Sequence, residues 1–163
     1  MKTDDNLKAA FAGESQAYMR YLGFARAAER EGNKQVARLF RALAEAEKIH
    51  ALNHLAVMGE VGKTEHNLSG GIDGETYEFT QMYPSFIAQA ERDGNSRAAL
   101  SFRGASTVEK IHGNLLKDAL NNLGREKETA YYVCSVCGNT VAGDAPDKCP
   151  VCGAAREKSR LVE

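Results

Sequence analysis

The sequence predicts a mainly α protein, a four-helix bundle followed by a small metal-binding β domain. Three observations support this. Residues 4–123 are rich in Ala, Leu, Glu, Lys and Arg, with apolar residues at helical spacing. Residues 29–50 recur 62 positions later as residues 91–112, with 11 of 22 positions identical, so a helical hairpin is duplicated. All four cysteines lie beyond Gly124, where the composition changes.

The first two predicted helices form one hairpin. The first runs from Asp4 or Asp5 to Glu31, and Gly32-Asn33 ends it. The second follows at once and stops near Gly59. Apolar residues and a few polar ones share the inner faces of both helices. They are Phe11, Glu14, Tyr18, Tyr21 and Ala25 on the first helix, and Val36, Leu39, Phe40, Leu43, Glu47 and His50 on the second.

The other two predicted helices repeat the hairpin after a long connection. Glycines at positions 62, 70, 71 and 74 predict that connection, and the third helix then runs from near Glu75 to Asp93. The fourth follows Gly94-Asn95 and continues to Leu123. A short loop, one long crossover and a second short loop are typical of a ferritin-like bundle. We therefore expect a bundle domain at 1–124, a polar linker at 125–129 and a second domain at 130–163.

The cysteine pattern predicts a metal site in this second domain. Its roughly 35 residues are too few to bury a stabilising core alone. Cys134-x-x-Cys137 and Cys149-x-x-Cys152 each precede a glycine, which lets a tight turn aim two sulfurs at one ion. A pair of disulfides is the alternative, which the metal-like spacing and the lack of a secretory signal disfavour. Spacing alone does not choose between iron and zinc.

A second group of potential ligands lies on the predicted helices. Two Glu-x-x-His pairs place a carboxylate and an imidazole one helical turn apart. Two such pairs, with one further Glu from each remaining helix, are the ligand set of di-iron carboxylate bundles. Solvated surface charges are the alternative, but these acids share a stripe with apolar residues, where unpaired carboxylates would be costly. The candidates are Glu14, Glu47, His50, Glu75, Glu78, Glu109 and His112.

Charge and composition exclude other classes of partner. The 21 Lys and Arg nearly balance the 22 Asp and Glu, for a net charge of -1, which gives no electrostatic footprint for nucleic acid or an anionic membrane. The first residues lack the basic and apolar regions of a secretory signal, and no apolar stretch approaches membrane-spanning length. We expect a cytoplasmic protein with no nucleic-acid or membrane partner.

Several segments together resemble the rubrerythrin family over essentially the whole chain: FAGESQA with Tyr21, the paired EKIH, GETYEFTQMYPSF and the cysteine knuckles. The resemblance implies a non-haem di-iron bundle joined to a rubredoxin-like iron centre, acting as a peroxidase that reduces hydrogen peroxide to water in oxidative-stress defence. It assigns the seven residues above to the di-iron site and adds Tyr21 and Tyr83 as hydrogen-bonding residues. It also implies that one iron moves between Glu78 and His50 as its oxidation state changes.

Two details refine this resemblance. Asn139, Thr140 and Val141 stand where rubredoxin-like domains commonly have aromatic residues, so zinc at the four cysteines is an alternative. We favour iron because a two-electron reductase needs a route for electrons. In addition, Tyr21 and Tyr83 are 62 residues apart but Glu14 and Glu75 only 61, so one residue is inserted in the third helix. Such an insertion predicts a π-bulge that aims Glu75 and Glu78 inward.

The path of electrons from the cysteine site to the di-iron site predicts a dimer. The fourth helix rises roughly 21 Å from Glu109 to Leu123, so we expect the small domain to lie far from the di-iron site of its own chain. A homodimer, head-to-tail or domain-exchanged, would shorten the path. No Gly-rich nucleotide-binding loop is present, so a separate pyridine-nucleotide-linked reductase or a rubredoxin would donate the electrons.

Two other functions use part of the same features. An iron-oxidising or iron-storing ferritin-like protein would share the bundle and the metal ligands, but it gains nothing evident from a cysteine domain. A non-catalytic electron carrier or zinc-stapled scaffold would need only the four cysteines. It would leave the seven aligned ligands of the bundle without a purpose.

Overall fold

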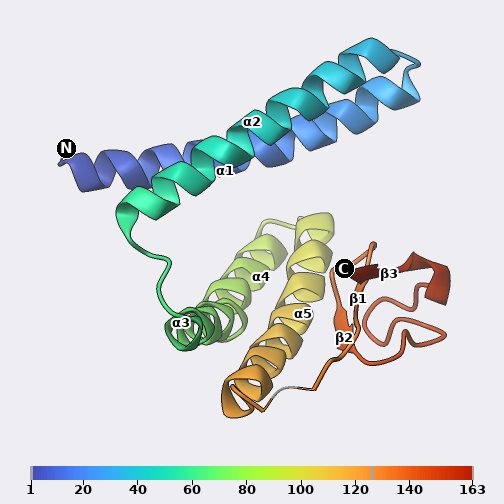
Figure 1. Ribbon diagram of the computed structural model, residues 1–163. Helices are drawn as coiled ribbons and strands as arrows, with labels where there is room; N and C mark the ends of the chain where they lie inside the picture. The colour runs from blue at the N-terminus through green and yellow to red at the C-terminus, as the bar shows by residue number, and fades with distance from the viewer. Residues whose placement is uncertain (1, 126, 163) are drawn as a thin grey trace. The chain divides into compact units, whose positions relative to one another are not determined.

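The computed structural model describes residues 2–125 and 127–162, which form two compact units (Figure 1). Residues 1–62 make a helical hairpin, and residues 63–163 make a second helical layer with a small β domain. Met1, Glu126 and Glu163, which fall within the expected domains and linker, lie outside the described residues. The mainly helical class with a small C-terminal β domain is confirmed. Among the described helices, none has the length and hydropathy of a membrane span.

The first unit is an antiparallel pair, α1 (Thr3–Arg30) and α2 (Lys34–Met58). The helices pack along a seam of small side chains, at intervals of seven on α2. The seam consists of Ala25 and Ala28 on α1 and Ala37, Ala44 and Ala51 on α2. Larger apolar side chains on the predicted inner face remain exposed, since Val36, Leu39 and Leu43 are 45%, 55% and 37% exposed. The α1–α2 packing by itself therefore leaves these apolar side chains outside the seam.

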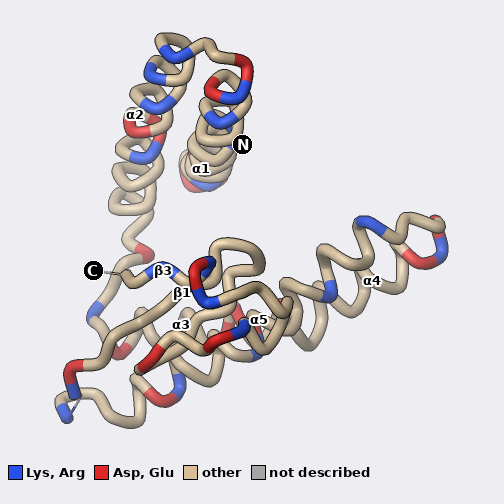
Figure 2. Tube along the Cα trace, turned by 90° about the vertical axis from the view of Figure 1, so that its right-hand side faces the viewer, with Lys and Arg blue, Asp and Glu red and all other residues tan. Residues whose placement is uncertain are grey.

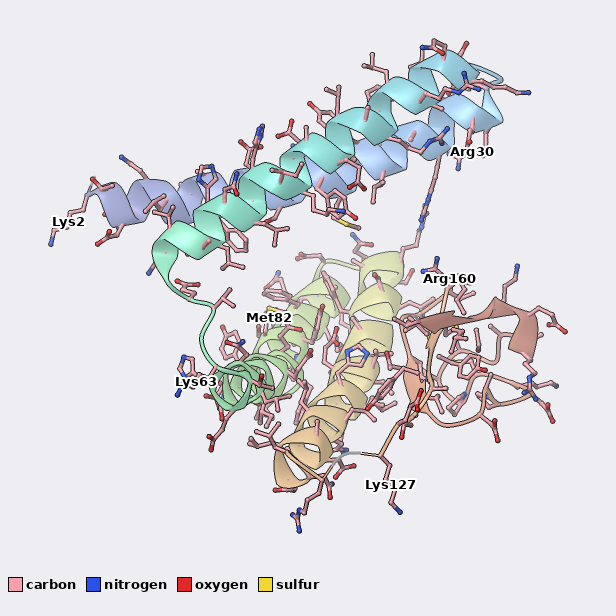
Figure 3. The ribbon with its side chains drawn as sticks, in the orientation of Figure 1. Lys2, Arg30, Lys63, Met82, Lys127 and Arg160 are labelled. Carbon is pink, nitrogen blue, oxygen red and sulfur yellow. The ribbon has the colours of Figure 1, made fainter. Side chains whose placement is uncertain are left out.

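In the second unit, α3 (Thr64–Tyr77), the π-helix η1 (Glu78–Met82) and α4 (Tyr83–Arg92) follow one another without a break, and α5 (Ser96–Asn121) runs back beside them. Figure 3 labels Lys63, just before α3, and Met82, at the end of η1. The predicted π-bulge is confirmed. The predicted start of the third helix near Glu75 is wrong, and the connection after α2 shortens to residues 59–63.

Close packing explains why a glycine-rich segment is helical here. A Cβ atom added to Gly71 would lie 3.1 Å from Cδ1 of Leu116 on α5, and one added to Gly113 would lie 3.6 Å from Cβ of Glu75. Each glycine costs a helix up to about 1 kcal/mol relative to alanine. The close contacts that these small residues allow between α3 and α5 outweigh that cost. Such packing between distant residues cannot be predicted from the local sequence.

This packing can be tested with two adjacent glycines. We expect Gly71→Leu to destabilise the protein by about 1–3 kcal/mol because the added side chain would overpack against Leu116. Gly70→Leu is the matched control, because no atom lies within 4 Å of a Cβ added there. Chemical denaturation of both variants measures the difference. Equal stabilities would show that α3 and α5 are not closely packed.

The small domain is a three-stranded antiparallel sheet in the order β2-β1-β3. Its strands are β1 (Tyr131–Cys134), β2 (Thr140–Ala142) and β3 (Ser159–Val162). The knuckle that joins β1 to β2 contacts α5, since a Cβ atom added to Gly138 would lie 4.0 Å from Cγ1 of Val108. Along the α1–α2 hairpin, acidic and basic residues are interspersed (Figure 2).

Candidate metal centres

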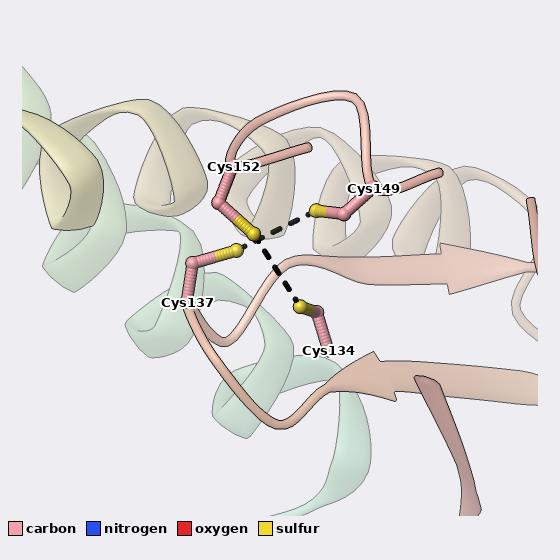
Figure 4. Close-up of side chains that lie close together, drawn as sticks. All are labelled: Cys134, Cys137, Cys149 and Cys152. Atoms are coloured by element: carbon pink, nitrogen blue, oxygen red, sulfur yellow. Dashed lines mark hydrogen bonds between the residues drawn. The ribbon is translucent and has the colours of Figure 1, made fainter. Parts of the chain in front are cut away.

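The four cysteines form a compact tetrad (Figure 4). The sulfurs of Cys134 and Cys152 lie 3.7 Å apart, and those of Cys137 and Cys149 lie 3.6 Å apart. Four sulfurs at about 2.3 Å from one ion would be about 3.8 Å from each other in a tetrahedron. A disulfide needs about 2.05 Å. All four thiols are free, so the tetrad fits a tetrahedral metal ion and not the disulfide alternative.

Backbone geometry creates the tetrad. The amide of Gly138 donates to the carbonyl of Cys134 at 2.9 Å, and the amide of Gly153 donates to that of Cys149 at 2.8 Å. Both glycines have positive φ, 81° and 72°, which closes each turn. Burial raises the pKa of the Cys137 thiol to about 12. Burial also acts to raise the pKa of Cys149, but backbone N–H groups of Cys152 and Val151 donate to its sulfur and lower the pKa to about 7.

The carboxylates and imidazoles gather in two sets of three, and each set lies inside one unit. The first unit holds Glu14, Glu47 and His50, and the second holds Glu75, Glu109 and His112. Within each set, one ligand atom from every residue lies within 4.8 Å of the others. The Glu-x-x-His pair has a similar contact in both sets. Nδ1 of His50 is 3.0 Å from Glu47, and Nδ1 of His112 is 2.8 Å from Glu109.

The second set, Glu75, Glu109 and His112, has carboxylates whose charge no nearby group fully compensates. Oε2 of Glu75 is buried and has no hydrogen-bond partner in the described part of the chain. Burial raises the pKa of Glu75, and the nearby charge of Glu109 raises it further. Burial and the charge of Glu109 also raise the pKa of Glu78. A divalent ion would offset the cost of crowding these carboxylates, so the residues fit a metal.

Glu78 lies outside the set of three, although its pKa responds to Glu109 and His112. It is the first residue of η1, and Glu75 precedes that π-helix by one turn of α3. Both side chains are partly buried. The irregular turn therefore places Glu75 in the set with Glu109 and leaves Glu78 outside it, and the inward aim of both carboxylates stays a prediction.

The two tyrosines belong to aromatic triads that sequence reasoning missed. Tyr21 packs against Phe24 and Phe40, with ring centroids 6.2 and 5.9 Å from its own. Tyr83 packs in the same way, 6.4 and 6.2 Å from the two phenylalanines located 62 residues later, Phe86 and Phe102. The repeat offset could have revealed both triads. Burial raises the pKa of Tyr83, and the charges of Glu78, Glu109 and Glu75 add to the effect, so this hydroxyl is close to the carboxylates.

The small domain touches a residue of the second set directly. Nε2 of His112 donates to the Thr140 hydroxyl at 3.0 Å and to the Gly138 carbonyl at 3.3 Å. The Thr140 hydroxyl in turn donates to the same carbonyl at 3.2 Å. A carbonyl only accepts, so the contact with Gly138 needs the proton on Nε2 of His112, and Nδ1 is then the ring nitrogen that would bind a metal ion held beside Glu109. The expectation that the small domain lies far from the candidate ligands of its own chain is wrong, because the chain after α5 folds back along that helix.

The rings of His50 and His112 differ in exposure and in the number of their hydrogen bonds. The side chain of His50 is 54% exposed, against 27% for His112. In the described residues, the ring of His50 is hydrogen-bonded to Glu47 alone. His112 is held from both ring nitrogens. Within its own unit, His50 is therefore held from one ring nitrogen, and His112 is held from both.

An open cavity of about 280 Å³ lies beside the second set. Glu75 and His112 line it together with Leu115, Tyr131 and Thr140. A cavity of this size admits a small oxidant or water to the edge of the carboxylate cluster. The lining is mixed, with the ionisable side chains of Glu75, His112 and Tyr131 and the hydroxyl of Thr140 beside leucine and alanine side chains.

Comparisons with known proteins agree with this geometry. A family model described as Rubrerythrin matches residues 5–120, and one described as Rubrerythrin, rubredoxin-like domain matches residues 132–158. The chain is 37% identical over 164 aligned positions to nigerythrin from Nitratidesulfovibrio vulgaris, covering 92% of this chain and 81% of that protein. It is 36% identical over 173 positions to rubrerythrin-2 from Clostridium acetobutylicum, covering 96% and 94%. The solved structure titled "Fully reduced state of nigerythrin (all ferrous)" covers 99% of this chain and 87% of its own, at 34% identity and a TM-score of 0.62.

Proposed function

Because the chain belongs to the rubrerythrin family, we propose that it is a non-haem di-iron peroxidase that reduces hydrogen peroxide to water. In this proposal residues 1–124 carry the di-iron site and residues 130–163 carry a one-electron iron centre. The seven ligands of the di-iron site are Glu14, Glu47, His50, Glu75, Glu78, Glu109 and His112, with Tyr21 and Tyr83 as hydrogen-bonding residues. The working form is a homodimer, and a separate reductase or rubredoxin supplies the electrons.

One observation carries the proposal, the direct contact between the cysteine domain and His112. Cys137 is covalently joined to Gly138, whose carbonyl accepts from His112. One hydrogen bond therefore separates a cysteine ligand from a candidate di-iron ligand. An iron store or a scaffold has no need of such a contact, whereas an enzyme that must return electrons singly to a two-electron site does. A related structure titled as all ferrous supports iron as the metal.

Each group has a defined part in the proposed reaction. The iron pair, when bound, supplies the two electrons that convert hydrogen peroxide and two protons into two molecules of water. Glu75 and Glu78, whose pKa values burial raises in the metal-free chain, would bind the iron ions as carboxylates. Tyr83 keeps its phenolic proton and can donate it in a hydrogen bond. Hydrogen bonds to Thr140 and Gly138 hold the ring of His112 in one orientation. The ring of His50 lacks such contacts on its second nitrogen in the described residues, which suits the exchange between His50 and Glu78 that the family resemblance implies.

The test is an anaerobic stopped-flow experiment on fully reduced protein of known iron content. One equivalent of hydrogen peroxide is mixed in, and the absorption of the di-iron site and the thiolate iron is followed together. Rapid oxidation with peroxide consumed, and much slower oxidation by dioxygen, is the expected result. Equal or faster reaction with dioxygen would instead support iron oxidation. Zinc in the cysteine site, with no change in its spectrum, would support the scaffold function.

The contact at His112 gives a separate prediction. We expect Thr140→Val to slow electron return from the thiolate iron to the di-iron site by about 10-fold, because outer hydrogen bonds of this kind orient a ligand. Thr140→Ser keeps the hydroxyl and is the control. The rate is read from re-reduction of the oxidised di-iron band in single-turnover experiments. An unchanged rate in both variants would show that the Thr140 hydroxyl is not needed on the path.

A further inference from the structure

We infer that Asn139 sets the reduction potential of the cysteine-bound iron, because its buried amide favours the reduced form of that centre. This role rests on the proposed one-electron function of residues 130–163 and adds to it. Among residues 2–125 and 127–162, which the structure describes, Asn139 is the one buried residue with an amide, hydroxyl or charged side chain, and it is 3% exposed. Its amide oxygen Oδ1 has no hydrogen-bond partner there. Burying such an atom unpaired is costly, so its presence needs a reason.

The turn itself does not need the amide. Asn139 occupies the position in the first cysteine turn that Ala154 occupies in the second, directly after the glycine. Each of the two residues donates its backbone N–H to the cysteine sulfur two positions earlier. Each also accepts, through its carbonyl, from the amide of the first cysteine of its turn, at 2.9 Å for Asn139 and 2.7 Å for Ala154. Because alanine makes the same backbone contacts, the side chain of Asn139 is not required to form them.

The usual structural reasons for asparagine in a turn are also missing. Asparagine is favoured where the backbone is left-handed, but every residue with positive φ in the described part of the chain is a glycine. Asparagine also closes turns when its side-chain oxygen accepts from a nearby backbone N–H. Oδ1 of Asn139 accepts no such bond. The amide therefore serves something other than the shape of the turn.

The charge of the iron centre supplies that reason. With four thiolates, the oxidised centre carries one negative charge and the reduced centre carries two. Polar groups around the sulfurs stabilise the more highly charged state and so raise the potential. The backbone of Asn139 is bonded directly to the sulfur of Cys137, so the amide belongs to the surroundings of the centre. Because Oδ1 is unpaired, no hydrogen bond at that atom opposes a turn of the amide that presents its N–H end to the added charge.

A raised potential has a defined use in the proposed reaction. The centre then takes an electron readily from an external donor and is filled before peroxide arrives. Asn139 lies between Gly138 and Thr140, which both contact the ring of His112. The segment that joins the cysteine centre to a candidate di-iron ligand therefore also sets the potential at which the electron is held.

Potentiometric titration of the iron-loaded, full-length protein tests this role, with the absorption of the thiolate iron as the readout. Asn139→Leu replaces the amide with an apolar side chain of similar size. We expect the midpoint potential to fall, so that the ratio of reduced to oxidised centre at the wild-type midpoint drops about 10-fold, which equals about 59 mV for one electron. An unchanged or raised midpoint overturns the inference.

Ala154→Asn is the matched control. It places the same amide in the equivalent turn at a position that is only partly buried, where water already solvates the charge. Its midpoint should therefore stay near the wild-type value. A shift there as large as that of Asn139→Leu would show that any substitution in these turns moves the potential, and it would overturn the role of the buried amide.

Two further measurements keep the test decisive. If Asn139→Leu does not fold or bind iron, Asn139→Ala replaces it, because Ala154 shows that alanine fits this turn. We expect a lower midpoint there too. A lower unfolding temperature without a change of midpoint in these variants would mean a structural role and overturns the inference. Peroxide consumption is measured on the same wild-type sample, and a shifted midpoint in a protein that consumes no peroxide would contradict the peroxidase proposal and leave the role of Asn139 standing.

Discussion

Glu47→Ala is expected to abolish peroxide turnover, with a loss of about three orders of magnitude or more. Glu47 lies within 4.8 Å of Glu14 and His50 in the first candidate ligand set, and its carboxylate is hydrogen-bonded to His50. Alanine removes one of the carboxylates that would hold the iron ions and frees the histidine. The iron pair should then be lost together with the activity. Metal analysis and peroxide consumption measure the two effects on the same sample.

Glu45→Ala is the matched control. Glu45 lies two residues away on the same helix, is exposed and forms an ion pair with Lys48 at 2.6 Å. An exposed pair of this kind contributes at most about 1 kcal/mol, so iron content and turnover should stay at the wild-type level. If both variants kept their activity, the Glu14, Glu47 and His50 set would not be part of the active site. If both lost it, the effect would lie in the stability of the hairpin.

The parts that could be predicted from the sequence are those that depend on short-range periodicity. Glu-x-x-His places two ligands on one face of any helix, and duplication repeats the pair, so Glu109 and His112 follow from Glu47 and His50. The cysteine tetrad follows from two tight turns that each need only five residues. The π-helix was also predictable, because the tyrosines and glutamates of the two repeats differ in spacing by one residue.

The parts that could not be predicted depend on contacts between distant residues. Gly71 is a poor helix residue, and only the nearby Leu116 explains why α3 includes it. The contact of Thr140 with His112 joins residues 28 positions apart. It forms because the chain turns back along α5, and no local sequence pattern predicts the direction of that turn. The two errors are the late predicted start of the third helix and the predicted distance between the small domain and the ligands of its own chain. They concern the extent and the neighbours of elements and not which elements exist. Both also bear on function, because one shortens the crossover and the other brings the cysteine site beside a ligand.

Zinc in place of iron at the four cysteines is expected to stop sustained turnover while leaving a single turnover intact. Zinc keeps the tetrahedral thiolate geometry, so the small domain stays folded and the contact of Gly138 and Thr140 with His112 is preserved. Zinc has no redox chemistry and cannot return electrons. Turnover driven by reductase should fall about 100-fold or more, whereas chemically reduced protein should still consume one equivalent of peroxide for each di-iron site.

Cys152→Ser separates this redox role from the structural one. The loss of one thiolate would remove the metal that holds a domain too small to fold on its core alone, so the contact with His112 would be lost as well. The serine variant should therefore lose sustained turnover and also perturb the di-iron spectrum, which zinc substitution leaves unchanged. Sustained turnover in the zinc protein would mean that electrons enter the di-iron site without passing through the cysteines. The contact at His112 would then only hold the small domain in place.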